Sequence, residues 1–204
     1  MRYRKIPEET IRRLPMYLRA LMFMPDKDRG YVSSKDLAEL LHLKPPKIRK
    51  DFSYFGAFGT RGTGYKIDSL IDQIRDALKL NGPQKAVLIG AGKLGTALVS
   101  YPGFKMYQFD ISTIYDVSPQ KIGEKIKGIA IQNVSKLPQL KNKNIKLAIL
   151  AVPADTAQGV ANTLIKAGVK GILNLAPCYL QVPKNAKVTT IDIAVELGVL
   201  PYYT

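Results

Sequence analysis

Three glycines interrupt an apolar run in AVLIGAGKLGTALV, residues 86 to 99, with a spacing that suits a dinucleotide. In the pattern G-x-G-x-x-G, the first glycine permits a tight turn and the second lets the backbone approach a pyrophosphate. The third allows a helix to pack closely, and the free N–H groups at the start of that helix attract phosphate. We therefore expect a cofactor-binding loop that consists of Gly90, Ala91, Gly92, Lys93, Leu94 and Gly95.

A carboxylate follows this loop at the distance that such a site requires. The stretch STIYD predicts a second strand, which ends in Asp116, 24 residues after Gly92. A carboxylate there accepts the hydroxyl groups of the adenosine ribose and repels a 2′-phosphate. The pattern therefore favours NAD(H) over NADP(H). A tight turn in some other α/β protein is the alternative that the glycines leave open.

The residues that a hydride-transferring enzyme needs are missing from this part of the chain. Hydride transfer to a carbonyl group normally needs a proton donor in the pocket, and the one histidine, His42, lies in the other part. Tyr101 and Lys105 have the four-residue spacing of a short-chain dehydrogenase, but the Pro-Gly between them predicts that no helix forms there. The 120 residues from 85 to 204 are nearly filled by a dinucleotide fold. We expect no catalytic residues and a site that only receives the cofactor.

A second group of chemically active residues lies in LKPPKIRKDFSYFG. Pro45 suits the first position of a helix, and Ile48, Phe52 and Phe55 recur at helical spacing, which predicts a buried face. Asp51 falls nearer that buried side, where we expect an ion pair with a basic neighbour. The opposite face carries cations, a hydroxyl and a phenol that could contact DNA, namely Lys47, Arg49, Lys50, Ser53 and Tyr54.

The elements around this helix follow the order of a helix-turn-helix domain with a wing. Apolar residues between 11 and 21 predict a first helix, with a kink or a late start at Pro15. Ser33 to Asp36 resembles a capping box before a short second helix. The segment FGAFGTRGTGY predicts a glycine-rich hairpin with Arg61 at its tip, as a wing that reaches the minor groove needs. An ordinary solvated basic face is the competing interpretation of the helix, and the wing makes DNA binding the better one.

The chain divides in composition near LNGPQK, residues 80 to 85, which is its clearest turn signal. It has 204 residues and a net charge of +15, and all nine arginines lie at or before residue 75. Arginine suits bidentate contacts to guanine and phosphate, whereas the lysines of the later part are also typical of proteins from hot habitats. We expect a winged-helix DNA-binding domain in residues 1–80 and an NAD(H)-binding domain with a dimerising C-terminal segment in residues 85–204.

Strands and helices alternate after residue 85 as in a doubly wound fold. A strand at 85–89 precedes a helix from Thr96, a further helix is predicted at 154–168, and the later strands are predicted at 146–152, 171–175 and 187–192. The predicted fold class is α/β, a Rossmann-like NAD-binding domain preceded by an N-terminal winged helix-turn-helix domain.

One cysteine, Cys178, is present, so we expect no disulfide within the chain and no metal site. No stretch has the length of a membrane span, and the first residues lack the apolar stretch of a signal peptide. These features predict a cytoplasmic protein.

The motifs, taken in order, resemble those of the Rex family of bacterial redox-sensing transcriptional repressors. The matching stretches cover nearly the full chain and include IPEETIRRLPMYLR, IRKDFSYFGAFGTRGTGY, VLIGAGKLGTAL, YPGF, YDVSPQKIG, AGVKGILNLAP and IDIAVEL. The resemblance implies a homodimer that binds palindromic operators of fermentation and respiration genes when NADH is low. NADH then acts as a regulatory ligand whose binding releases the DNA.

The resemblance also implies roles for individual residues. Arg49 and Lys50 match the DNA contacts of the recognition helix, and Arg61 matches the contact of the wing. Residues 90–95 and Asp116 match the NAD(H) site.

Three further residues match the redox switch of the family. Tyr101 resembles the tyrosine near the nicotinamide, and Asp192 resembles its redox-linked partner. Arg19 resembles the arginine that pairs with this aspartate across the dimer when DNA is bound. The family mechanism therefore predicts that Asp192→Ala keeps NADH binding measurable but separates it from DNA release.

The sequence leaves two other functions open. An NAD-dependent reductase that merely adheres to DNA would turn over small carbonyl substrates. A non-specific DNA-binding protein indifferent to NAD would show an affinity that falls steeply with salt and never depends on sequence.

Overall fold

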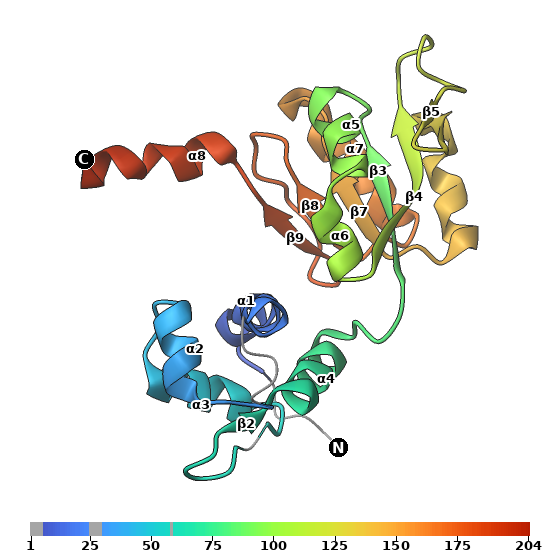
Figure 1. The fold of residues 1–204 in the computed structure, drawn as a ribbon. Helices are drawn as coiled ribbons and strands as arrows, with labels where there is room; N and C mark the ends of the chain where they lie inside the picture. Colours follow the sequence, from blue (N-terminus) through green and yellow to red (C-terminus); the bar gives the residue numbers. More distant parts are fainter. Residues whose placement is uncertain (1–5, 25–29, 58) are drawn as a thin grey trace. The chain divides into compact units, whose positions relative to one another are not determined.

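In the computed structural model, the chain forms two compact units, Met1–Gly82 and Pro83–Thr204 (Figure 1). The structure describes residues 6–24, 30–57 and 59–204. Phe58, an aromatic residue of the predicted hairpin, lies outside the described residues. None of the helices found in those ranges is long and apolar enough to span a bilayer.

The first unit consists of helices and a short antiparallel strand pair, and Phe52 is fully buried in its core. The Phe52 ring meets Tyr17 and Tyr65 edge-on, each with a centroid distance of 5.0 Å. The predicted inward residues Ile48, Phe52 and Phe55 are all buried, which confirms the predicted face. The elements are α1 (Glu8–Phe23), β1 (Tyr31–Val32), α2 (Ser34–Leu40), α3 (Pro45–Ser53), β2 (Tyr65–Lys66) and α4 (Ile67–Leu78).

Helix α1 passes through Pro15, which excludes the late start; the kink, the other alternative at Pro15, stays a prediction. A proline inside a helix costs about 3 kcal/mol because it removes a backbone donor and crowds the preceding turn. Leu14, Leu18 and Leu21 are fully buried on one side of α1, and their burial outweighs this cost, at about 1.5–3 kcal/mol for each side chain.

The predicted capping box at the start of α2 is confirmed. The Ser33 hydroxyl accepts hydrogen bonds from the N–H groups of Lys35 and Asp36, both at 3.2 Å. The Asp36 carboxylate accepts the N–H of Ser33 at 3.0 Å. This cap fixes where α2 begins and therefore how α2 leads into α3.

The second unit is built on a seven-stranded sheet with the order β5-β6-β4-β3-β7-β8-β9. Every neighbouring pair is parallel except β5 with β6. Numbered along the chain, the parallel strands lie in the order 3-2-1-4-5-6, which is that of Rossmann domains. The predicted doubly wound fold is therefore confirmed. The strands are β3 (Gln84–Ile89), β4 (Phe109–Asp116), β5 (Lys125–Ile126), β6 (Ile129–Asn133), β7 (Leu147–Leu150), β8 (Gly171–Asn174) and β9 (Lys187–Thr190).

Both faces of this sheet are covered by apolar side chains. Successive residues of a strand point to opposite faces, so neighbouring residues of β3 belong to different clusters. Val87 and Ile89 of β3 belong to one core cluster with Leu164 of α7. Leu88, between them, belongs to the other cluster, against which Leu98 of α5 packs. The helical segments are α5 (Lys93–Val99), α6 (Pro102–Met106), the 3-10 segment η2 (Val134–Lys143), α7 (Ala154–Lys166), α8 (Ile193–Gly198) and the 3-10 segment η3 (Leu200–Tyr203).

Two helix predictions in the second unit are wrong. Helix α5 begins at Lys93 rather than Thr96, because the extended Gly92 already forms its N-cap. Helix α6 forms although Pro-Gly was expected to prevent it. Pro102 stands at the first helical position, where a missing N–H removes no hydrogen bond within the helix.

Candidate DNA-reading helix and dinucleotide site

Helix α3 presents a basic face to solvent. Lys47, Arg49, Lys50 and Ser53 are exposed, and Tyr54 is half-buried. Pro45 is the first residue of the helix, as predicted, and the Lys44 side chain provides no cap. The structure therefore brings all the candidate residues of α3 to one accessible surface.

Two of these cations have partners within the first unit. Arg49 donates to the Ser34 hydroxyl at 3.1 Å, which ties α3 to the start of α2. Lys47 lies 3.7 Å from the Glu9 carboxylate in an exposed pair. Such pairs contribute little at the surface, so both side chains can exchange them for phosphate or base contacts.

The opposite side of α3 is fixed by Asp51, whose exposed fraction is only 1%. Arg13 of α1 donates two hydrogen bonds to the Asp51 carboxylate, at 2.6 and 2.9 Å. The hydroxyl groups of Tyr17 and Thr10 donate two more, at 2.7 and 2.9 Å. The ion pair expected for Asp51 is confirmed, and α1 supplies every donor side chain.

These contacts shift the pKa values of the cluster in consistent directions. Burial would raise the pKa of Asp51, but hydrogen bonds from Arg13, Tyr17 and Thr10 lower it below its usual value. The hydrogen bond to Asp51 raises the pKa of Arg13. Burial, followed by the hydrogen bond to Asp51, raises the pKa of Tyr17. The cluster is therefore an ionised Arg13–Asp51 pair with a protonated Tyr17 at neutral pH.

A hairpin extends beyond α3, with Arg61 exposed in its turn. Thr60 and Gly64 form an isolated antiparallel bridge on either side of this turn. Gly64 has a φ of +96°, and a Cβ there would overlap the carbonyl group of Val32 in β1. Only glycine allows this close approach, which confirms the predicted hairpin with arginine at its tip.

The glycine loop of the second unit has the geometry that its pattern predicts. Gly90 has a φ of +98°, and a Cβ there would overlap the Ala151 carbonyl group at the end of β7. A Cβ on Gly95 would overlap the carbonyl group of Gly90. Gly92 differs, because a Cβ there would meet nothing within 4 Å. The backbone at Gly92 therefore faces the free space that a pyrophosphate needs.

Asp116 lies beside this loop at the end of β4, with an exposed fraction of 8%. Its two oxygens accept the N–H groups of Ala91 at 2.7 Å and Ser118 at 2.8 Å. Burial would raise the pKa of Asp116, but these hydrogen bonds and the charge of Lys121 lower it. An ionised carboxylate accepts about four hydrogen bonds, so it retains capacity for ribose hydroxyls.

Lys121 also lies beside the glycine loop and Asp116, and the sequence did not reveal it. Its ammonium group donates to the Ala91 carbonyl at 3.1 Å and lies 3.8 Å from Asp116. The only signal in the sequence is its place five residues after Asp116 in YDVSPQKIG. Lys121 therefore places a positive charge beside the Asp116 carboxylate.

A second polar side chain lies where a parallel strand ends, which is the edge of the sheet that carries the glycine loop. Asn174 is fully buried at the end of β8. Its amide donates to the carbonyl groups of Ala176 and Cys178, at 3.2 and 2.8 Å, and to the hydroxyl of Thr190 at 3.2 Å. Asn174 thus fixes the loop that follows β8, at the same edge of the sheet as the glycine loop.

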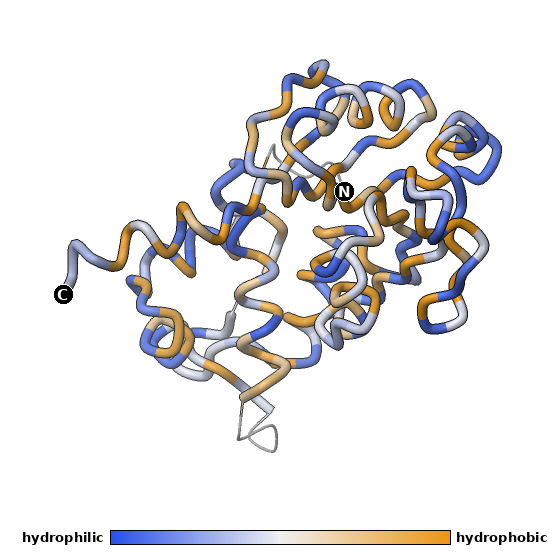
Figure 2. Tube along the Cα trace, turned by 90° about the horizontal axis from the view of Figure 1, so that it is seen from above, coloured by the Kyte–Doolittle hydropathy of each residue, from blue (hydrophilic) through white to orange (hydrophobic). Residues whose placement is uncertain are grey.

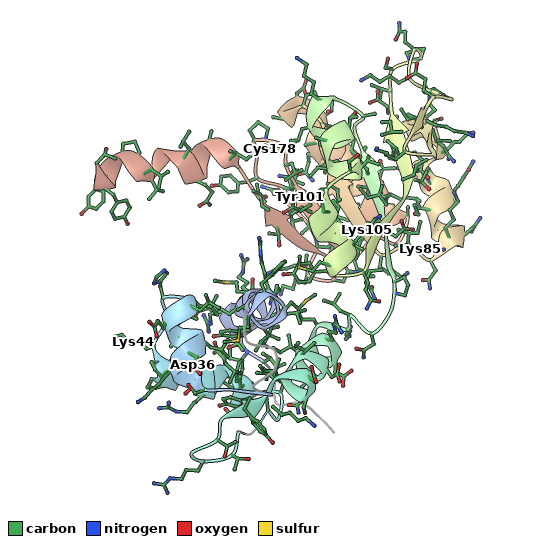
Figure 3. The ribbon with its side chains drawn as sticks, in the orientation of Figure 1. Asp36, Lys44, Lys85, Tyr101, Lys105 and Cys178 are labelled. Carbon is green, nitrogen blue, oxygen red and sulfur yellow. The ribbon has the colours of Figure 1, made fainter. Side chains whose placement is uncertain are left out.

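Tyr101 is the N-cap residue of α6 and is half-exposed (Figure 3). Its ring meets Phe104 edge-on with a centroid distance of 5.3 Å, and a Cβ on Gly103 would overlap it. The ring therefore lies along the start of α6. Tyr101 thus precedes the helix proper rather than pairing with Lys105 across one of its turns.

Asp192 caps α8, because its carboxylate accepts the N–H groups of Ala194 and Val195 at 3.0 and 3.4 Å. Arg19 is exposed on α1 in the first unit. Among the described residues, no hydrogen bond joins Tyr101 to Asp192 and no ion pair involves Arg19. The Arg19 contact that the family resemblance implies runs across a dimer, so the switch contacts stay a prediction.

A winged helix-turn-helix unit with a basic recognition face precedes a Rossmann unit with a glycine loop and a terminal carboxylate. This combination defines a DNA-binding protein with a dinucleotide-type ligand domain. Family models agree with both units. "Putative DNA-binding protein N-terminus" matches residues 5–53, and "CoA binding domain" matches residues 81–178.

Curated relatives then identify the family. A redox-sensing transcriptional repressor Rex of Brevibacillus brevis is 41% identical over 203 residues, which cover 99% of this chain and 98% of the relative. The Rex of Carboxydothermus hydrogenoformans is 44% identical over 199 residues, or 97% and 96% of the two chains. This protein belongs to the Rex family of redox-sensing transcriptional repressors.

Solved structures of a Rex-family repressor, RSP, have the same fold. The complex of RSP with NAD⁺ and operator DNA has a TM-score of 0.90 and 31% identity, and covers 98% of this chain and 93% of RSP. The complex of RSP with NADH has a TM-score of 0.86 and 30% identity, with coverages of 98% and 94%.

Proposed function

We propose that this protein is a redox-sensing repressor that binds operator DNA as a homodimer and leaves it when NADH binds. The DNA is read by a winged-helix domain in residues 1–80, and NADH is bound by a Rossmann domain in residues 85–204. The chain acts as a sensor of the NADH/NAD⁺ ratio rather than as an enzyme. In a bacterial cell this function belongs in the cytoplasm, where the chromosome and the dinucleotide pool lie.

One observation carries this proposal: a basic recognition face and a glycine loop with its carboxylate occur in one chain, on separate units. Membership of the Rex family supports the same function. RSP has been crystallised both with NADH and with NAD⁺ plus operator DNA, so both ligands have a precedent in the family.

Homodimer formation is supported by the C-terminal segment, which packs little apolar surface against its own unit. Ile193 of α8 is 68% exposed, Leu197 is 63% exposed and Tyr202 of η3 is 86% exposed. Figure 2 shows stretches of hydrophobic colour along this segment. A contiguous exposed apolar surface usually marks a protein interface, and helix-turn-helix proteins commonly bind two-fold operators as dimers.

The proposed switch couples the nicotinamide to the dimer. NAD⁺ carries an extra positive charge at the ring, whereas the reduced ring is neutral and tolerates an apolar, closed pocket. In the proposed mechanism, this difference biases Tyr101 and Asp192, and Asp192 then releases Arg19 of the partner subunit.

A direct test is fluorescence anisotropy of a palindromic operator duplex, selected from a random pool, with the protein at half saturation. NADH, NAD⁺, NADPH and coenzyme A are each titrated at fixed salt. We expect NADH to release the duplex at concentrations where the other three have little effect. Unchanged anisotropy with all four ligands would reject ligand-controlled repression, and turnover of small carbonyl substrates would then favour the reductase.

A further inference from the structure

The amino-terminal edge of the sheet in the second unit carries a dense group of lysines. In a parallel sheet all strands begin at the same edge, so the residues that start β3, β7 and β8 lie together there. The helical segments η2 and α7 leave the opposite edge and return, so their last residues lie at this edge too. The edge therefore collects the six exposed lysines Lys85, Lys141, Lys143, Lys146, Lys166 and Lys170.

Strand pairing places three of these lysines in one row. Ala86 pairs with Leu147 and Leu147 with Gly171, so the preceding residues Lys85, Lys146 and Lys170 are neighbours across β3, β7 and β8. Adjacent strands are about 4.8 Å apart, which is close enough for the like charges to repel.

Very little negative charge opposes this row. From residue 125 to residue 191 the chain has ten lysines and one acidic residue, Asp155. Asp155 opens α7 at the other edge of the sheet. The one carboxylate that the strand register places at the lysine edge is that of Asp110, opposite Lys85. Among the described residues, none of the six lysines forms an ion pair.

We propose that this lysine edge is a second, sequence-independent contact for the DNA that flanks the operator. The inference rests on the proposed function, because it requires α3 to hold the protein on DNA. Lysine suits such a contact, since its ammonium group is a solvated point charge that pairs with phosphate without reading bases.

The segment that connects the two units is short. DNA bound by the first unit is therefore the polyanion within reach of this edge. Helix α4 ends at Leu78, and the chain reaches Lys85 seven residues later, where it enters the sheet (Figure 3). Seven residues span at most about 25 Å. Once the first unit is bound, this short connection holds the edge near flanking phosphates at an effective concentration on the order of millimolar. Non-specific DNA binding has dissociation constants of about 10⁻⁴ to 10⁻⁶ M, so even a weak contact is occupied.

The test compares two variants of the full-length protein with equal loss of charge. Lys146→Gln/Lys170→Gln removes two neighbours of the row. Lys125→Gln/Lys136→Gln is the matched control, with two exposed lysines of the same unit. Lys125 lies on β5, at the far end of the sheet from β9, and Lys136 follows the carboxyl end of β6. Operator affinity is measured by anisotropy from 50 to 200 mM salt, with a minimal operator and with an operator extended on both sides.

For the extended operator, we expect the row variant to lower the slope of log affinity against log salt by about 0.9 for each lost phosphate contact. The ratio of operator to scrambled-sequence affinity stays unchanged, and the control keeps the wild-type slope. On the minimal operator the row variant behaves like the wild type.

Equal slopes for the row variant and the control on the extended operator would overturn the lysine-edge proposal while leaving operator recognition intact. Equal slopes together with lysine-dependent co-sedimentation with phosphatidylserine vesicles would assign the edge to membranes and overturn it as well. Loss of all operator binding by the unmodified protein would instead reject the proposed function.

Discussion

At the scale of single residues, one carboxylate holds the recognition helix. Asp51 accepts four hydrogen bonds, all from side chains of α1. Helical spacing predicted that Asp51 faces inward, because it falls beside Ile48 and Phe52 on the helical wheel. The spacing within α3 cannot identify the hydrogen-bond partners of Asp51, since Thr10, Arg13 and Tyr17 are 34 to 41 residues away in the sequence. Long-range contacts of this kind depend on how α1 packs, which no local pattern encodes.

Tyr17→Phe tests this cluster, because it removes one donor to the buried carboxylate and keeps the ring. We expect α1 and α3 to lose about 2 kcal/mol of stability, as for a buried hydrogen bond to a charged group. Hydrogen exchange of the backbone amides in these helices measures the loss. The control is Glu8→Gln, which removes the exposed Glu8–Arg12 pair at 3.2 Å and should cost less than about 0.5 kcal/mol. Equal effects of the two variants would contradict a central role for Asp51.

The same carboxylate makes the first unit sensitive to acid. The pKa of Asp51 is lower in the folded state than its ordinary value of 3.8. A lowered pKa means that the stabilisation is present above pH 3.8 and is lost as the pH falls from 3.8 through the folded value. We therefore expect the amide protection of α3 to decline more steeply in this range for the wild type than for Asp51→Asn. The Asn variant should already be weaker at pH 7 by about 3–5 kcal/mol, because it leaves Arg13 without its carboxylate. Identical pH profiles would show that Asp51 is not the group that titrates.

At the scale of elements, the central strands could be predicted more completely than the helix ends, whereas β5 and β6 at one side of the sheet were not predicted. Buried β-branched runs identified β3, β7 and β8 because a parallel strand is apolar on both faces. The start of α5 was placed three residues late, since a glycine N-cap leaves no side-chain signal. Helix α6 was missed because Pro-Gly was interpreted as a helix breaker, although Pro102 occupies the position where proline fits.

Two glycines of the loop differ in role: Gly95 is needed for folding, and Gly92 is expected to be needed for ligand binding. Gly95→Ala introduces a methyl group that overlaps the Gly90 carbonyl, so we expect it to lower the melting temperature of the protein. Gly92→Ala meets open space and ordinary backbone angles, so it should fold almost normally but fill the room for the pyrophosphate. NADH affinity, measured by fluorescence titration, should fall at least tenfold in Gly92→Ala. Normal NADH binding by Gly92→Ala would move the phosphate site away from this loop.

Asp192 caps α8 and also carries a negative charge. Two substitutions at this position distinguish the two roles. Asparagine caps a helix about as well as aspartate, whereas alanine costs about 1 kcal/mol. If the charge drives the switch, both Asp192→Asn and Asp192→Ala should bind NADH but no longer release operator DNA in response. Anisotropy titrations with NADH measure this release. A wild-type response of Asp192→Asn would assign Asp192 to the support of α8 and remove it from the proposed switch.

At the scale of the whole molecule, the proposed switch needs two subunits, because Arg19 is expected to pair with Asp192 of the partner subunit. Sequence motifs identified both units and the glycine loop, because these depend on local spacing. They placed Arg19, Tyr101 and Asp192 only through family resemblance, because no local spacing relates a residue to its partner in another subunit. Lys121 stayed hidden for a similar reason, since its contacts with Ala91 and Asp116 form only after the sheet is assembled.

Thermodynamic linkage gives the sharpest test of the assembled protein. If NADH weakens operator binding by some factor, operator must weaken NADH binding by the same factor, typically 5- to 150-fold. We expect NADH fluorescence titrations with and without saturating operator to give the factor that operator anisotropy gives with and without saturating NADH. A scrambled duplex at the same salt is the control and should leave NADH affinity unchanged. Release of operator by NADH without the reciprocal loss of NADH affinity would mean that the cofactor acts other than by equilibrium binding. Consumption of NADH during the experiment would then favour the reductase over the sensor.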